Sequence, residues 1–269
     1  MKRTALLFGA VALIILAGLF LLASCGEETD KGQDPGTAEP EDTAGKDTEA
    51  PGTEDTGAET EPAPEREVSL PAAEEINKGD ILTFGVYEQD NDLSNGPEPV
   101  EWQVLENKDG IVYVISRYVL DAKRFYNVCK AVQWDESIVR EWLNGEFYDT
   151  AFNDAEKSLI QLTSVTDPSF PGFRSTEDRI FLLSFLEIVK YFPLSPSRVC
   201  APTPYAYYYG SSSYAGNAEA TGWWLRTPGA SDGYCSGVSD EGDCTNLSHV
   251  VTDLRGVRPV MKLDLTADK

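Results

Sequence analysis

The sequence predicts an α+β domain whose first and last strands lie together, with short helices between them. Segments near residues 81–115 and 223–265 are rich in β-branched and aromatic residues and are bounded by turn residues, which is typical of strands. The segment between them carries helix-capping signals instead. All five Trp and all twelve Tyr lie after residue 79. A span of roughly 190 residues suits one domain with a sizeable core.

The first part of the predicted domain contains three strands, and a hairpin turn joins two of them. Asp109-Gly110 separates the second strand from the third, and Asp-Gly between apolar runs is a strong hairpin signal. The three predicted strands cover residues 81–87, 99–105 and 111–115.

Three short helices are predicted in the middle, each from a cap. Asp135 or Ser137 caps the first, which ends at Asn144-Gly145. The other two helices each begin at a pair of residues with the spacing of a capping box. These are Asn153 to Glu156, and Ser184 to Glu187 in a helix that runs to Phe192. The last third returns to strands, predicted over residues 223–227, 234–238, 247–252 and 257–265.

The N-terminus has the pattern of an export signal. Lys2 and Arg3 precede an apolar run over residues 5–23, and Leu22-Ala23-Ser24-Cys25 ends it. This ending resembles the lipobox of bacterial lipoproteins. The resemblance implies that residues 1–24 form a cleaved signal peptide and that Cys25 carries a diacylglyceryl group, which anchors the chain to the outward face of the cell membrane. The alternative is an uncleaved anchor helix, since about 19 apolar residues nearly span a bilayer.

Residues 25–78 are predicted to be the lipidated Cys25 and a disordered linker. Residues 26–78 contain 17 acids and 4 bases, and Thr, Glu, Pro and Gly dominate. No aromatic residue occurs between Phe20 and Phe84. Such a segment cannot bury enough apolar surface to offset its ordering entropy, and like charges extend it. We therefore expect a spacer that holds a domain over residues 79–269 away from the membrane.

The domain resembles an uncharacterised bacterial domain family with no assigned activity, found in exported and surface proteins. The resemblance covers essentially residues 79–265, and its clearest motifs are Trp223-Trp224-Leu225-Arg226-Thr227-Pro228-Gly229 and Val257-Arg258-Pro259. Others are Gly79 to Gly85, Asp90 to Gly96, Glu101 to Leu105, Trp142 to Gly145, Phe147-Tyr148 and Ala151-Phe152. The family's order of elements implies a C-type-lectin-like fold, which formylglycine-generating enzymes also use. This is an analogy of fold, and it assigns no function.

The charge of the domain excludes one class of partner, and its cysteine count suggests disulfides. Residues 79–269 carry 28 acids and 16 bases, without a basic cluster, so nucleic-acid binding is excluded. An even number of cysteines in an exported domain suggests disulfides. We prefer the pairs Cys129–Cys200 and Cys235–Cys244, with free buried thiols as the alternative.

The sequence contains one candidate metal site, a calcium-loop pattern that begins at Asp90. Asp90, Asp92 and Ser94 have the spacing of a calcium loop, and Glu101 falls at the twelfth position. Glycine comes at position seven instead of six, however, and strands flank the loop. An Asx-rich turn without any metal has the same composition. No other cofactor is predicted.

Aromatic residues just before and at the start of the predicted strand over residues 223–227 form the candidate ligand-binding set. Tyrosine and tryptophan rings suit stacking on sugars or docking against proteins, and the alternative is that they pack in the core. The set comprises Tyr205, Tyr207, Tyr208, Tyr209, Tyr214, Trp223 and Trp224. Arg226 and Arg258 each lie close to a proline at a strand end, and we expect them to pair with buried carboxylates such as Glu101 or Asp253.

No catalytic residue is predicted. The single histidine, His249, lies in a predicted strand without any accompanying hydrolase motif, and phosphate-binding glycine loops are absent from the sequence. We expect a membrane-anchored surface lipoprotein that displays a non-catalytic module for a glycan or a protein. One alternative is an extracytoplasmic enzyme, either a hydrolase or a formylglycine-type oxidase, whose site leaves no local motif. The other is a structural domain without a small ligand.

Overall fold

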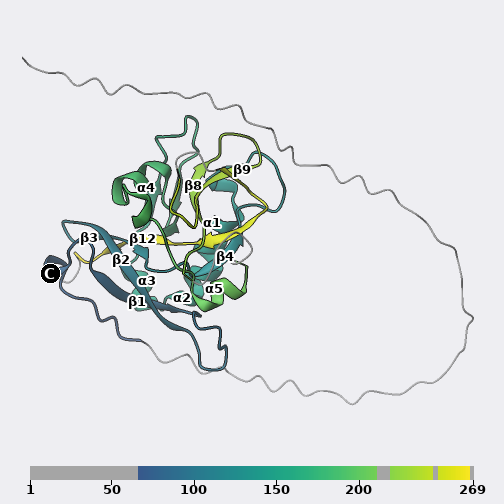
Figure 1. Ribbon diagram of the computed structural model, residues 1–269. Helices are drawn as coiled ribbons and strands as arrows, with labels where there is room; N and C mark the ends of the chain where they lie inside the picture. Colours follow the sequence, from purple (N-terminus) through teal and green to yellow (C-terminus); the bar gives the residue numbers. More distant parts are fainter. Residues whose placement is uncertain (1–65, 211–218, 245–247, 267–269) are drawn as a thin grey trace, which may run out of the picture. The chain divides into compact units, whose positions relative to one another are not determined.

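The computed structural model describes residues 66–210, 219–244 and 248–266 (Figure 1). Within these ranges the chain forms two five-stranded sheets and one two-stranded sheet, joined by short helices. The predicted α+β class is therefore confirmed.

The first sheet brings the two ends of the domain together. Its strands are all antiparallel, and the C-terminal strand β12 lies between β3 and β7. Asp109 and Gly110 both have positive φ, which matches the type I′ hairpin that Asp-Gly predicts. In order across the sheet, the strands are β1 (Ile81–Tyr87), β2 (Glu98–Lys108), β3 (Ile111–Ser116), β12 (Val260–Asp264) and β7 (Ile180–Phe181).

The second sheet holds the tryptophan-rich strand in its centre. The strand β8 pairs antiparallel with β9 and parallel with β11, which makes this sheet mixed. Its order is β10 (Ser248–Val250), β9 (Tyr234–Val238), β8 (Trp223–Pro228), β11 (Leu254–Val257) and β4 (Asp121–Arg124). The small third sheet pairs β5 (Thr163–Val165) with β6 (Thr176–Asp178).

The predicted strand over residues 257–265 is two strands in the structure. Arg258 and Pro259 separate β11 from β12, and the chain passes there from the second sheet to the first. Proline has no N–H to donate to a ladder, so a strand interior cannot continue through it. The Pro259 carbonyl still accepts from the Ser116 backbone N–H at 2.9 Å, which joins the crossing point to the first sheet.

The first predicted helix does not end at Asn144-Gly145. It continues from α1 (Ile138–Trp142) through a π-helical turn, η3 (Leu143–Phe147), into α2 (Tyr148–Ala151). The Asn144 side chain does not end the helix, because its amide accepts from the backbone N–H of Arg179 and donates to the carbonyl of Ile180. It thereby fastens the helix to the strand β7.

Both predicted capping boxes are confirmed. Asn153 and Glu156 begin α3 (Asp154–Leu159), and Ser184 and Glu187 begin α4 (Phe185–Tyr191). The remaining helical elements were not predicted: α5 (Pro204–Tyr208) and the single 3-10 turns η1 (Ala73–Glu75), η2 (Trp134–Glu136) and η4 (Ser195–Ser197).

Residues 66–78, assigned to the linker from their composition, pack on the domain. Ile76 is buried, and Val68 and Leu70 are partly buried against the core. Arg66 Nη2 forms an ion pair with Glu156 Oε2 at 2.9 Å, and that carboxylate also accepts from the Gly85 backbone N–H. Composition assigned these residues to the linker because it gives little weight to a few apolar side chains spaced along an acidic stretch.

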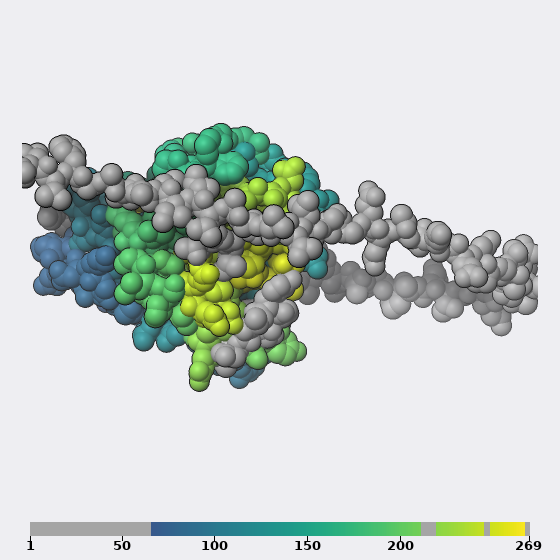
Figure 2. Space-filling model, turned by 45° about the horizontal axis from the view of Figure 1, so that its top comes forward, coloured from purple at the N-terminus to yellow at the C-terminus, as the bar shows by residue number. Residues whose placement is uncertain are grey.

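One hydrophobic core links the two large sheets. Its largest fully buried side chains include Trp102 of the first sheet and Trp223 and Trp224 of the second. In the space-filling view, the blue residues that begin the domain and the yellow C-terminal residues belong to the same body (Figure 2). Among the described residues, no helix is long and apolar enough to cross a bilayer.

Candidate functional site

The two tryptophans of the predicted ligand set belong to the core. Every residue of β8 is buried, because the strand lies in the centre of its sheet with side chains packed on both faces. The indole N–H of Trp223 donates to the Arg198 carbonyl at 3.2 Å, and that of Trp224 donates to the Lys123 carbonyl at 2.9 Å. Neither ring can contact a ligand, so this part of the prediction is wrong.

The tyrosines of the predicted set gather on the short helix α5. Thr203 caps this helix by accepting from the Ala206 N–H, and Pro204 occupies its first turn. Tyr207, Tyr208 and Tyr209 are exposed, and Tyr208 keeps 70% of its surface open to solvent. Tyr214, the remaining member of the set, lies outside the described residues.

A continuous series of aromatic contacts connects the exposed rings to the core. Phe147 lies 5.1 Å from Tyr87, which is 5.9 Å from Tyr205, between ring centroids. Tyr205 lies 4.5 Å from Tyr209, which lies 5.1 Å from Tyr208. We call Tyr87, Tyr205, Tyr208 and Tyr209 the tyrosine ladder. Edge-to-face and offset contacts of this kind fix ring positions, so the exposed rings are held in place.

A buried carboxylate lies at the inner end of the tyrosine ladder. Asp121 accepts from the Tyr87 hydroxyl at 2.6 Å and pairs with Lys123 Nζ at 2.8 Å. Lys123 Nζ also lies 4.6 Å from the centroid of the Trp142 ring. Burial, followed by the charge of Asp121, raises the pKa of the Tyr87 hydroxyl well above its usual value. Tyr87 is therefore a hydrogen-bond donor, not a proton acceptor, at physiological pH.

Further acids surround the same tyrosines. Burial is the main cause that raises the pKa of Tyr205, and the charges of Asp121, Glu88 and Glu146 add to it. The backbone of Tyr205 joins this region to the loop after β1, since its N–H donates to the Gln89 carbonyl at 2.9 Å. The ladder therefore lies in an acidic environment.

The residues of the predicted calcium loop are engaged in other contacts. Asp92 accepts from the N–H and hydroxyl of Ser94, and Asp90 accepts from the Asp92 N–H and the Asn95 amide. Glu101 lies on β2 and pairs with Arg117 at 2.9 Å. In this structure the carboxylates of Asp90 and Asp92 accept hydrogen bonds from within the loop, as they do in an Asx-rich turn.

A different acidic group lies at the base of this loop. Oxygen atoms of Glu88, Asp90 and Glu98 lie within 4.8 Å of one another, close enough to share a cation. Burial and the neighbouring Glu98 charge raise the pKa of Glu88. One oxygen of Glu98 already has a hydrogen-bond partner, because its Oε2 accepts from the Gln89 backbone N–H at 2.7 Å. Asp90 is the single residue that this group shares with the predicted set.

The arginine of the Trp-Trp-Leu-Arg motif has a structural role, as predicted, but with another partner. Arg226 is buried, and its Nη1 donates to Glu187 Oε2 at 2.5 Å and to the Leu182 carbonyl. Its Nη2 donates to the Thr166 carbonyl at 2.7 Å. Because Glu187 also caps α4, this arginine ties β8 to the start of that helix.

Arg258 of the second motif is held by aromatic rings. Its guanidinium lies 5.2 Å from the Trp223 ring centroid and 5.4 Å from that of Phe192, and its Nε donates to the Ser116 carbonyl. Neither Glu101 nor Asp253, the expected carboxylate partners, contacts it in the described part of the chain. Stacking on aromatic faces suits a buried guanidinium, which is weakly hydrated.

The cysteines and the histidine do not form a reactive site among the described residues. Cys200, Cys235 and Cys244 are free and buried, so neither preferred disulfide is present. Burial raises the pKa of each of these thiols, which keeps them protonated and unreactive. The half-buried His249 lies edge-on to Trp224, and its Nε2 has no hydrogen-bond partner among the described residues.

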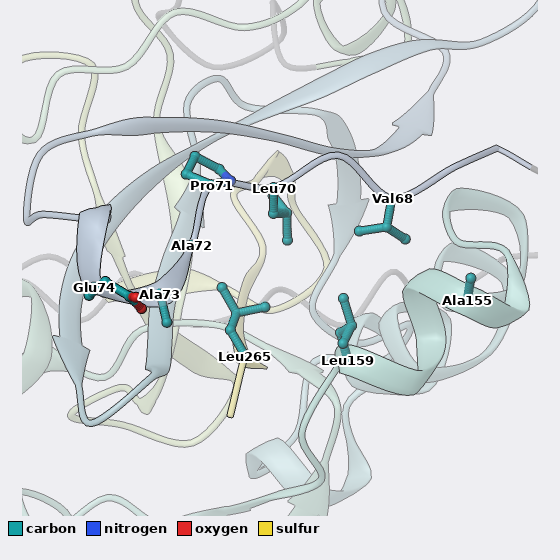
Figure 3. A pocket seen from close by; sticks show the side chains of 9 residues that line it. All are labelled: Val68, Leu70, Pro71, Ala72, Ala73, Glu74, Ala155, Leu159 and Leu265. Atoms are coloured by element: carbon teal, nitrogen blue, oxygen red, sulfur yellow. The ribbon is translucent and has the colours of Figure 1, made fainter. Parts of the chain in front are cut away.

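An apolar groove of about 540 Å³ lies where the chain enters the domain (Figure 3). Val68 and Leu70 face Leu159 of α3 and Leu265 at the end of β12. The groove is separate from the tyrosine ladder: it is formed by residues 68–74, α3 and Leu265. Sequence reasoning missed it, because its first wall was assigned to the linker.

Comparison with known proteins adds a family but no activity. No curated protein and no solved structure matches the chain. Residues 109–265, more than half of the chain, match a domain of unknown function, DUF6273, and this range includes α5, β8 and both arginine motifs. The chain therefore belongs to the DUF6273 family.

Proposed function

We propose that this chain is a membrane-anchored surface lipoprotein whose domain is a non-catalytic binding module with a C-type-lectin-like fold. The Leu22-Ala23-Ser24-Cys25 sequence, which lies outside the described residues, supports the anchor, and the acidic residues after it support a spacer. A chain of this composition extends because its charges repel one another. The domain then faces outward, where a glycan or a surface protein is available as its ligand.

The observation that supports binding is the exposure of the tyrosine ladder. Tyr208 is 70% exposed, yet its ring is in contact with Tyr209, which contacts Tyr205. Large exposed rings lose little conformational entropy on binding when they are already fixed, and tyrosine is enriched in the energetically important parts of interfaces. Exposed rings held in this way indicate a surface prepared for a partner.

Binding without turnover can be tested on glycan and protein arrays with the full-length chain in detergent. We expect a glycan or a protein to be retained and recovered unchanged, and Tyr208→Ala to reduce retention. Leu194→Ala is the matched control, because Leu194 is 69% exposed but lies between α4 and η4. Hydrolysis of an arrayed envelope polymer, with no retained ligand, would instead favour the enzyme alternative.

The lipid anchor has its own test. Radiolabelled fatty acid should be incorporated into the chain in a bacterial host, and Cys25→Ala should abolish that incorporation while leaving the protein membrane-bound or secreted. Incorporation that persists in the variant would refute the assignment of Cys25. This result and the array result are independent, so the anchor and the binding surface can fail separately.

A further inference from the structure

The tyrosine ladder combines aromatic rings with acidic side chains. The charges of Glu88 and Glu146 act on Tyr205, and neither acid forms an ion pair in the described part of the chain, whereas Asp121 is paired with Lys123. Glu146 is exposed and Glu88 is half-buried. Aromatic faces and carboxylates both attract cations, because the ring quadrupole places negative potential over the ring face.

The protein already holds one ammonium group in this way. Lys123 Nζ lies 4.6 Å from the centroid of the Trp142 ring and 2.8 Å from Asp121. Trp142 in turn lies edge-on to Tyr87, at the inner end of the ladder. An internal lysine therefore occupies the inner part of this surface, between a ring and a carboxylate. The outer part has rings and acids as well, and no lysine or arginine of the described residues lies over the rings of Tyr205, Tyr208 or Tyr209.

Resting on the proposed binding function, we infer that the tyrosine ladder binds the ammonium groups of a lysine-rich polypeptide segment of a partner protein. Successive helix residues point about 100° apart, so Tyr207, Tyr208 and Tyr209 do not form one flat platform for a sugar ring. Rings that point in different directions leave spaces into which long, flexible side chains fit. The acidic surroundings supply the charge complementarity.

The test uses a hexalysine peptide as the probe and the full-length chain in detergent, with binding measured by calorimetry at low and moderate salt. Tyr208→Leu removes the ring but keeps an apolar side chain, whereas Tyr208→Phe keeps the ring. We expect Tyr208→Leu to weaken hexalysine binding about two- to fivefold, the size of one exposed cation–π contact, and Tyr208→Phe to weaken it less than about twofold.

A matched pair of charge variants separates this surface from general attraction to an acidic protein. Glu88→Gln with Glu146→Gln removes two charges beside the ladder, and Glu74→Gln with Glu75→Gln removes two exposed charges on η1, beside the apolar groove. Both double variants change the net charge equally. The first should weaken hexalysine binding at least about threefold more than the second, because close charges act more strongly than screened distant ones.

Equal losses in the two double variants, or equal binding by Tyr208→Leu and the unmodified chain, would overturn the inference. A hexamer of glucosamine that binds the ladder more tightly than hexalysine would also overturn it, because the ligand would then be an amino sugar. In that case the proposed binding function would stand, since the same Tyr208 variants would still report a ligand. Retention of an array ligand through Tyr208 without hexalysine binding would overturn the inference alone, whereas binding of neither an array ligand nor hexalysine would refute the proposed function as well.

Discussion

His249 offers the most direct test of the electrostatics of the second sheet, because it is the single histidine of the chain. Its ring lies edge-on to Trp224 and packs over Gly237 of β9, where an added Cβ would come within 2.8 Å of the imidazole Cδ2. Burial, together with the positive charge of Arg255, lowers the pKa of His249 from 6.5 to about 4. The folded protein therefore holds this imidazole neutral.

The sign of the effect on stability follows from this lowered pKa. Above pH 6.5 the imidazole is neutral in both the folded and the unfolded chain, and the contribution of His249 to stability is fully present. Between pH 6.5 and about 4 the unfolded chain takes up a proton that the folded chain does not, so stability is lost as the pH falls. Each pKa unit corresponds to about 1.4 kcal/mol, which gives about 3 kcal/mol for the whole interval. Since the ring is only half-buried, solvent screening reduces our expectation to about 2 kcal/mol.

Two measurements check this prediction. The imidazole C2 proton gives one NMR signal, provided that no histidine tag is present, and its titration midpoint should lie near pH 4. Urea unfolding of the native chain and of His249→Gln, at pH 7.5 and pH 4.5, isolates the histidine from the many carboxylates that titrate in the same range. The native chain should lose about 1 to 2 kcal/mol more than the variant on acidification. A midpoint above pH 6, or equal losses in both proteins, would refute the reasoning.

Three further predictions concern stability, each measured by urea unfolding. Gly85→Ala should lower the stability by about 3 kcal/mol or more, because Gly85 has φ +70° and a Cβ there would lie 2.5 Å from the Phe152 ring. Gly79→Ala should lower it by about 1 kcal/mol, because Gly79 has φ +96° but no atom lies within 4 Å of an added Cβ. Equal losses in the two variants would contradict this steric argument. A domain that starts at residue 79 should be about 3 kcal/mol less stable than one that starts at residue 66, since it lacks buried Ile76 and the ion pair of Arg66. Equal stability of the two domains would support the boundary predicted from composition. Arg226→Lys should cost about 2 kcal/mol, because a lysine cannot reproduce the several hydrogen bonds that the guanidinium makes; a loss below about 0.5 kcal/mol would show that these bonds contribute little.

Local signals in the sequence predicted most of the regular structure. The Asp109-Gly110 hairpin and the capping boxes at Asn153 and Ser184 depend on contacts between residues a few positions apart, so the sequence displays both partners. The helix through Gly145 was mispredicted for the opposite reason. The amide of Asn144 is bound by β7, which is distant in the chain, and that contact overrides the usual tendency of Asn-Gly to end a helix.

The candidate site depended on contacts that composition does not reveal. Tyr205 to Tyr209 were identified as a candidate surface, but nothing in the sequence showed that Tyr87, far away in the chain, anchors them through Tyr205. The same holds for Glu187 as the partner of Arg226. Trp223 and Trp224 were misassigned because an aromatic pair has the same sequence whether its strand is central or at the edge. The consecutive apolar residues Trp223, Trp224 and Leu225, without alternation, were the available signal for burial on both faces.

The crossing at Pro259 has a kinetic consequence. Because β11 and β12 each lie between two other strands of their sheets, neither large sheet is complete until residues 254–264 are in place. A chain that emerges N-terminus first therefore cannot complete its core before residues 254–264 have emerged, and the closing contacts join residues far apart in the sequence. Folding dominated by such distant pairings is slow. The strands β11 and β12 thus set the earliest point at which both large sheets can close.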